Sequence, residues 1–195
     1  MRDPISYDEY QDFELNAALA SEEEHRATAE RLIELSRESH PDDEVSPQDL
    51  LVSAGSQLRF AGDLQRAQEV LWQAHAQGQR DGMDPRAVIV DMLLTQDDAV
   101  QAQDVSNEIR RSRPLAPMTY HYLAELWDEQ GETTRALGWF MRGIMLIELE
   151  GMPDHQFTML CVGRWRIRER EGLEPDEYDE IALDFRDEMQ DRVGE

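Results

Sequence analysis

The sequence predicts an all-α protein built from antiparallel helical hairpins, and three observations support this fold class. Apolar and small residues recur at helical spacing through most of the chain. Glycine and acidic residues interrupt this spacing at intervals, as they do at tight turns. No stretch shows the apolar and polar alternation of a half-buried strand. Together these features predict ten helices arranged as five hairpins.

The clearest hairpin is centred on Gly62 and Asp63. The residues at helical spacing on its two sides are Leu51, Ala54, Gly55 and Leu58, then Ala67, Leu71 and Ala74. The same frame returns around Gly131 and Glu132, with Tyr120, Leu123, Ala124 and Trp127 before the break and Ala136, Phe140 and Gly143 after it. A weaker copy lies between them, with Ile89, Val90, Leu93, the Asp97-Asp98 break, Ala102 and Ile109.

Three alanines mark the period of this repeat. Ala67, Ala102 and Ala136 are 35 and 34 residues apart, a spacing typical of stacked helical hairpins. With Gly55 and Ala124, they are small enough to let two helices approach closely. We therefore expect all five to be buried where helices cross.

Residues 46–150 resemble three consecutive tetratricopeptide repeats (TPRs). The first and third copies match well, whereas in the second copy Arg86 stands where a large apolar residue is usual and Asp97 replaces the turn glycine. The resemblance implies a right-handed superhelical solenoid whose concave groove, lined by the first helix of each hairpin, binds partners. Residues 1–45 are expected to form a degenerate N-terminal hairpin and residues 151–195 a C-terminal capping hairpin, all in one continuous solenoid domain.

Several helix starts are marked by proline, whose missing N–H costs nothing in a first turn. The prolines concerned are Pro47, Pro85, Pro117, Pro153 and Pro175.

The charge balance is strongly acidic, with 43 Asp and Glu against 19 basic residues, all arginine, and a formal net charge of −24. Such a chain repels phosphate backbones, so we expect no direct nucleic-acid binding and favour a basic protein or peptide partner. An acidic surface that merely reflects a GC-rich genome or a saline cytoplasm is an alternative. We expect a cytoplasmic protein without a membrane interaction, because no apolar run is long enough to span a bilayer and the first residues lack an apolar signal core.

Residues for catalysis, metals or cofactors are few. The single cysteine, Cys161, lies among apolar residues and is expected to be a buried small hydrophobe. His121 and Glu125 are four apart on one helix face, but the spacing predicts no third ligand. No phosphate loop or nucleophile elbow is present. We therefore predict no enzyme activity, no metal and no cofactor.

The predicted partner site is the face of the first helices that the core does not use. Its residues are Val52, Ser56, Arg59, Ala87, Asp91, Leu94, Met118, His121, Glu125 and Asp128. Asp91, Glu125 and Asp128 are expected to form an acidic strip there, suited to a basic peptide. The carboxylate clamp of chaperone-binding TPR proteins is missing, since Val52 and Ser56 stand where the resemblance implies its first Lys and Asn, and Val88 replaces the following Asn.

The arginines around Trp165 are a local exception to the acidity. At four-residue spacing they form two pairs, Arg164 with Arg168 and Arg166 with Arg170. One pair is expected to point toward the groove. The favoured interpretation is pairing with Glu169, Glu171 and the acidic run 174–180, and the alternative is a patch that binds a small anion or an acidic partner. The predicted function is a non-catalytic scaffold or adaptor. The alternatives are an acidic decoy that sequesters a basic nucleic-acid-binding protein and, third, an enzyme of unrecognised type.

Overall fold

The computed structural model describes residues 2–15, 20–78, 82–151 and 155–193, and every regular element in these ranges is an α-helix. The all-α prediction is confirmed, and the described residues contain ten helices and no strand. The chain divides into two compact units, Met1–Pro114 and Leu115–Glu195. This division falls inside the 46–150 segment that resembles three repeats.

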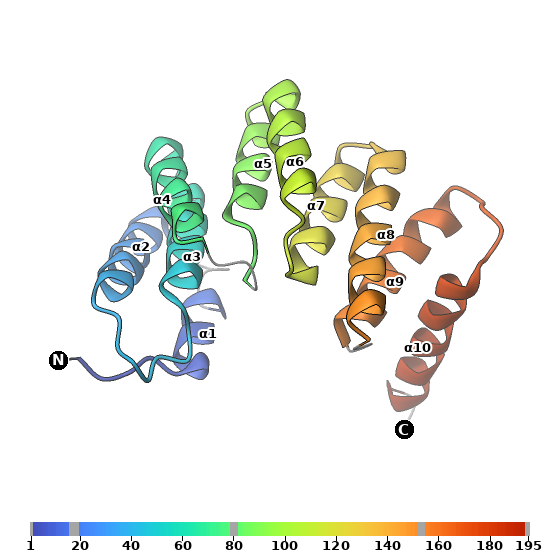
Figure 1. Ribbon diagram of the computed structural model, residues 1–195, viewed down its shortest axis with the longest axis horizontal. Coiled ribbons are helices and arrows are strands. Elements are labelled where there is room, and N and C mark those ends of the chain that lie inside the picture. The colour runs from blue at the N-terminus through green and yellow to red at the C-terminus, as the bar shows by residue number, and fades with distance from the viewer. Residues whose placement is uncertain (1, 16–19, 79–81, 152–154, 194–195) are drawn as a thin grey trace. The chain divides into compact units, whose positions relative to one another are not determined.

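The described residues of the first unit form six helices (Figure 1). They are α1 Tyr7–Leu15, α2 Glu22–Arg37, α3 Pro47–Phe60, α4 Leu64–Ala76, α5 Pro85–Thr95 and α6 Ala99–Ser112. From α2 onward each helix packs on the next, and the first helices of two successive hairpins, α3 and α5, also contact each other. Short turns join α3 to α4 and α5 to α6, so each of these pairs is an antiparallel hairpin.

The second unit contains four helices with the same order of contacts. They are α7 Pro117–Glu129, α8 Thr133–Glu150, α9 His155–Arg170 and α10 Glu177–Val193. Each packs on the next, and α7 also packs on α9. In this unit too, the first helices of successive hairpins therefore lie side by side.

Proline and a capping side chain begin several of these helices. Pro47, Pro85 and Pro117 occupy the first turns of α3, α5 and α7, as predicted. The Ser46 and Asp84 side chains accept hydrogen bonds from free backbone N–H groups of α3 and α5. Pro175 precedes the start of α10 at Glu177, and Pro153 lies outside the described residues.

The turns inside the α3/α4, α5/α6 and α7/α8 hairpins share one geometry, although the α5/α6 turn has no glycine. Gly62 and Gly131 have positive φ values of 74° and 72°, and Asp97 takes the same left-handed conformation with φ 58°. The residue after each then donates its backbone N–H to a carbonyl five positions earlier, at Leu58, Leu93 and Trp127, each at 2.9 Å. The weaker second copy therefore keeps the turn at a conformational cost that glycine would avoid.

The small residues predicted at helix crossings are buried. Ala67, Ala102, Ala124 and Ala136 are all fully covered, and a Cβ on Gly55 would lie 2.6 Å from the Leu71 side chain. A larger residue at any of these places has to push two helices apart.

Arg86, the residue that departs from the repeat pattern, is also buried. Its Nε donates to Oδ1 of Asp84 at 3.0 Å and its Nη2 to Oδ2 at 2.7 Å. The Nη2 also donates to Ser112 Oγ at 2.7 Å. Asp84, which caps α5, thus neutralises the charge of Arg86, and this lets an arginine occupy an apolar position.

Of the described helices, none has both the length and the apolar content to cross a membrane.

Candidate functional site

The ten predicted groove residues divide between the two units. Six lie on α3 and α5 of the first unit and four on α7 of the second. Val52, Ala87 and Leu94 are buried in the interior, with exposed fractions of 7%, 0% and 7%. These three side chains therefore have almost no surface to offer a partner.

The two charged residues among the six first-unit groove residues, Arg59 and Asp91, form an ion pair. Arg59 of α3 places Nη1 2.8 Å from Oδ2 of Asp91 on α5, and its guanidinium lies 4.6 Å from the centre of the Phe60 ring. Ser56 is partly exposed beside them. Asp91 is thus already partnered by an arginine of its own unit.

The second unit has a pocket of about 270 Å³ between α7 and α9. Its lining residues are Pro117, Met118 and His121 of α7 and His155, Gln156, Met159 and Leu160 of α9. Met118 and His121 were predicted to belong to the partner site, and Met118 is half exposed. His155 and Met159 were not predicted, although their four-residue spacing places them on one face of a helix.

His121 forms the inner wall of this pocket. Its ring packs edge-on against Phe140 of α8, with 5.7 Å between ring centres. Its Nε2 lies 3.7 Å from Oε1 of Glu125. Burial lowers the pKa of His121 below its usual range, Glu125 opposes that shift, and Arg166 adds to it. A shift in this direction favours the neutral form of the imidazole.

Beyond the pocket, the same face of α7 carries two carboxylates that are paired with arginines of α9. Glu125 Oε2 lies 2.5 Å from Nη2 of Arg166, and Asp128 Oδ1 lies 2.7 Å from Nη2 of Arg170. The hydrogen bond from Arg170 holds the pKa of Asp128 below its usual value.

These pairs correct the expected acidic strip. Asp91, Glu125 and Asp128 all have an arginine partner within their own unit, and they are divided between two units. The predicted acidic strip took account only of residues of the first helices within each repeat, so it omitted the arginines of the next hairpin. Arg166 and Arg170, from the next hairpin, neutralise the second-unit carboxylates.

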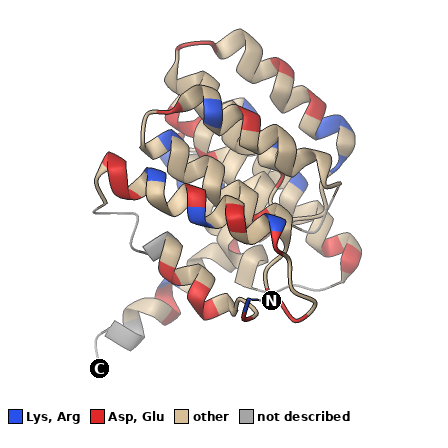
Figure 2. Cartoon of the chain, turned by 90° about the vertical axis from the view of Figure 1, so that its left-hand side faces the viewer, with Lys and Arg blue, Asp and Glu red and all other residues tan. Residues whose placement is uncertain are grey.

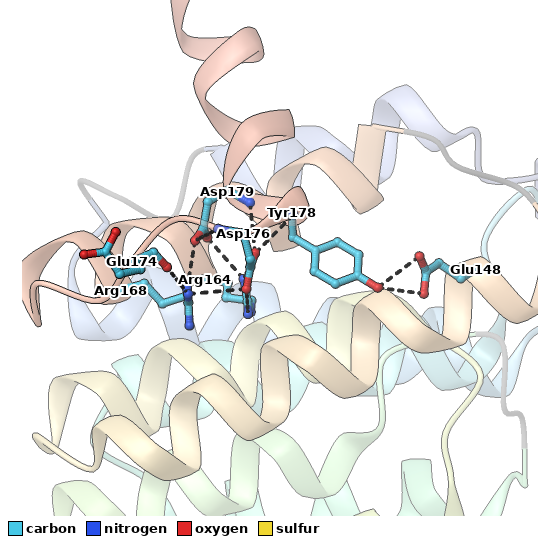
Figure 3. A network of polar contacts seen from close by, with 7 residues as sticks. All are labelled: Glu148, Arg164, Arg168, Glu174, Asp176, Tyr178 and Asp179. Carbon is cyan, nitrogen blue, oxygen red and sulfur yellow. Dashed lines mark hydrogen bonds and ion pairs between the residues drawn. The ribbon is translucent and has the colours of Figure 1, made fainter.

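The other two arginines of α9 hold α10 in place (Figure 3). Arg164 lies 2.6 Å from Asp176 and 3.1 Å from Asp179, and the Arg168 Nε donates to Asp179 at 2.8 Å. Tyr178 donates its hydroxyl to Glu148 of α8 at 3.1 Å. Pairing with the acidic run 174–180 is thus confirmed for this pair, whereas the Arg166 and Arg170 pair faces α7.

A cysteine and a histidine outside this site are also buried. Cys161 is fully buried, as expected, and burial raises its pKa to about 12, so its thiol is protonated at neutral pH. His25 is buried against Gln57, with 2.7 Å between His25 Nδ1 and Gln57 Oε1. Across the described ranges, no cluster of three or more His, Cys, Asp or Glu is placed to hold a metal ion.

Charge is distributed along the helices and is not concentrated in one segment. Figure 2 shows acidic residues on most helices with arginines interspersed among them.

Comparisons of the chain with protein families, with curated proteins and with solved structures find no match. The function must therefore be inferred from the residues and their geometry.

Proposed function

We propose that this protein is a non-catalytic interaction module of the TPR type, a cytoplasmic scaffold or adaptor that binds a protein or peptide segment on the exposed face of α7 and α9. The repeat period of 35 and 34 residues and the recurring hairpin turns support the TPR assignment. Repeat proteins of this kind use their first helices as an extended binding surface. We therefore propose the partner site on α7 and α9, two first helices that lie side by side.

The pocket between α7 and α9 is the observation that carries this proposal. It is mostly apolar, and its volume of about 270 Å³ accepts one large apolar side chain. A half-exposed methionine at its mouth adapts to the shape of the side chain that enters. Anchors of this sort, seated in a pocket, contribute most of the affinity of many peptide complexes.

The charges of the protein indicate which residues should flank the apolar anchor of the partner. Because Glu125 and Asp128 are already paired, they add little local attraction. The net charge of −24 acts at longer range and favours the approach of basic segments. We therefore propose a partner segment that carries one apolar anchor flanked by basic residues.

A selection from a random peptide display library against the full chain tests this function. Calorimetry on the selected peptides should show that Met159→Asp weakens binding at least about tenfold, because a charge in the pocket opposes burial of the anchor. Met145→Asp is the matched control, since Met145 is half exposed on α8 outside the pocket. Equal affinities of the two variants would remove the pocket from the mechanism.

The acidic-decoy alternative makes the opposite prediction. A decoy binds basic proteins through exposed carboxylates, so reversing Asp184 and Glu188 on the exposed face of α10 should then weaken binding more than Met159→Asp does. The interaction-module proposal expects the reverse order of effects.

A further inference from the structure

Four side chains around the α7/α9 pocket can ligate a metal ion through sulfur or imidazole nitrogen. Each helix contributes one methionine and one histidine: Met118 and His121 from α7, and His155 and Met159 from α9. The two members of each pair are three or four residues apart, so their Cβ atoms lie about 5–6 Å from each other on one face of the helix. All four residues line the same pocket.

The donor types select the ion. Thioether sulfur is a soft ligand that favours copper(I), and imidazole also suits copper. Hard cations such as Ca²⁺ and Mg²⁺ require several oxygen ligands, and structural Zn²⁺ sites use thiolates with imidazoles. Among the described residues that line the pocket, none is acidic and none is a cysteine. This donor set therefore matches copper(I) better than any of these divalent ions.

His121 already has the surroundings of a metal ligand. Histidines that bind metals usually direct their second ring nitrogen toward a carboxylate, which sets the ring orientation. Glu125 Oε1 lies near Nε2 of His121, at 3.7 Å, which is longer than a hydrogen bond, and Arg166 holds the other Glu125 oxygen at 2.5 Å. The Nδ1 of His121 is then left for an ion.

The methionines can close around the ion. Met118 is half exposed and Met159 partly exposed, so both sulfurs are free to turn. We propose that the pocket binds one copper(I) ion through the four side chains Met118, His121, His155 and Met159. This site does not depend on the proposed function, because the ion binds whether or not a protein partner exists. A bound ion and an apolar anchor would exclude one another from the pocket.

The test is titration of the full chain with copper(I) under anaerobic conditions against a chromophoric copper(I) chelator. We expect one ion per chain to be withdrawn from the chelator. The double variant Met118→Leu/Met159→Leu keeps the size and apolar character of the pocket while removing both sulfurs. It should bind copper(I) at least about tenfold more weakly, since even the loss of an outer-shell contact at a metal site has effects of this size.

The matched control is Met145→Leu/Met189→Leu, which removes two exposed thioethers from α8 and α10. This variant should bind the ion as the parent does, and circular dichroism checks that both variants remain helical. Failure of the parent chain to compete with the chelator would overturn the proposal, as would equal affinities of the two double variants. Zinc binding tighter than copper(I) binding and insensitive to both pairs of substitutions would also overturn it.

Discussion

Asp97 is a non-glycine residue in a left-handed turn conformation. Its φ of 58° matches the glycines at the equivalent turns, and an L-residue pays about 1–2 kcal/mol in this region, with Asp among the more tolerant types. The neighbouring Asp98 has a separate task, because its side chain caps α6 by accepting from the Gln101 N–H at 3.1 Å. Two adjacent aspartates thus make opposite contributions to stability.

Asp97→Gly should therefore stabilise the protein by up to about 1 kcal/mol, because glycine adopts this conformation without strain. Asp98→Ala should destabilise it by about 1 kcal/mol through loss of the cap. Urea unfolding followed by circular dichroism measures both. A lower midpoint for Asp97→Gly would show that the Asp97 side chain has a stabilising contact that outweighs its backbone strain.

Gly163 lies where α9 crosses α8. A Cβ at this position would lie 2.5 Å from two ring carbons of Phe140, and Phe140 is fully buried. Gly163→Ala should consequently destabilise by about 1–3 kcal/mol through overpacking. Gly138→Ala is the control, because its Cβ meets only the end of the flexible Arg142 side chain, and the gain in helix propensity there is up to about 1 kcal/mol. The two alanine variants should shift the urea midpoint in opposite directions.

At the scale of elements, a buried ion-pair network attaches α10 to α9. Asp179 is 1% exposed and accepts hydrogen bonds from Arg164 and Arg168. It also accepts from the backbone N–H of Asp176 at 3.0 Å. Removing Asp179 leaves two guanidinium groups without a buried counter-charge. This network therefore contributes more to stability than exposed ion pairs do.

Asp179→Ala should accordingly destabilise the protein by about 3–5 kcal/mol, the usual cost of breaking a buried pair. Asp187→Ala removes an exposed partner of Arg186 on the same helix and should cost at most about 1 kcal/mol. Thermal unfolding compares the two. Similar small losses for both variants would mean that water replaces the Asp179 contacts.

The same network predicts a response to acid. The hydrogen bond from Arg164 lowers the pKa of Asp176 to about 2, below the value of about 3.9 expected for an unfolded chain. A lowered carboxyl pKa stabilises the fold above about pH 4, and this contribution is lost as the pH falls toward 2. Because Asp176 is partly exposed, we expect roughly 1 kcal/mol.

Asp176→Asn isolates this contribution from those of the other carboxylates. The difference in unfolding free energy between parent and variant should be largest above about pH 4 and shrink toward pH 2. Urea titrations at several pH values measure it. A difference that is constant over this range would indicate that the Asp176 charge does not stabilise α10.

At the scale of the whole molecule, the net charge of −24 is the dominant feature. Excess charge of one sign disfavours the compact state through self-repulsion. Figure 2 shows acidic residues along most helices, and the chain has 43 Asp and Glu but only 19 arginines to pair with them. Exposed pairs each contribute little and are themselves screened by salt.

Raising NaCl from 10 mM to 150 mM should therefore stabilise the protein, because the screening length falls from about 30 Å to about 8 Å. Urea, which is uncharged, is the suitable denaturant, and its midpoint should rise with salt. Choline chloride at equal ionic strength should have the same effect, which separates screening from specific cation binding. A falling midpoint would show that the arginine pairs outweigh the repulsion.

The helical hairpins and their close crossings follow from the sequence alone. Helical spacing, proline at helix starts and a residue suited to a positive φ at each turn are local properties, set within about ten residues. Small residues such as Ala67 and Ala136 could be predicted as buried for the same reason, because the period of the repeat places them on the face between two helices. Asp97 replaces the glycine of the equivalent turns, but its backbone takes the same left-handed conformation.

The sequence alone predicted the α7 residues of the α7/α9 site but not the α9 side chains that meet them. Glu125 pairs with Arg166 and Asp128 with Arg170, and His121 shares a pocket with His155 and Met159. Each of these partners lies a whole hairpin away along the chain, so their meeting depends on how α7 and α9 are rotated and aligned against each other. Hairpin periodicity specifies which helices are neighbours, whereas close packing in three dimensions specifies which side chains face one another.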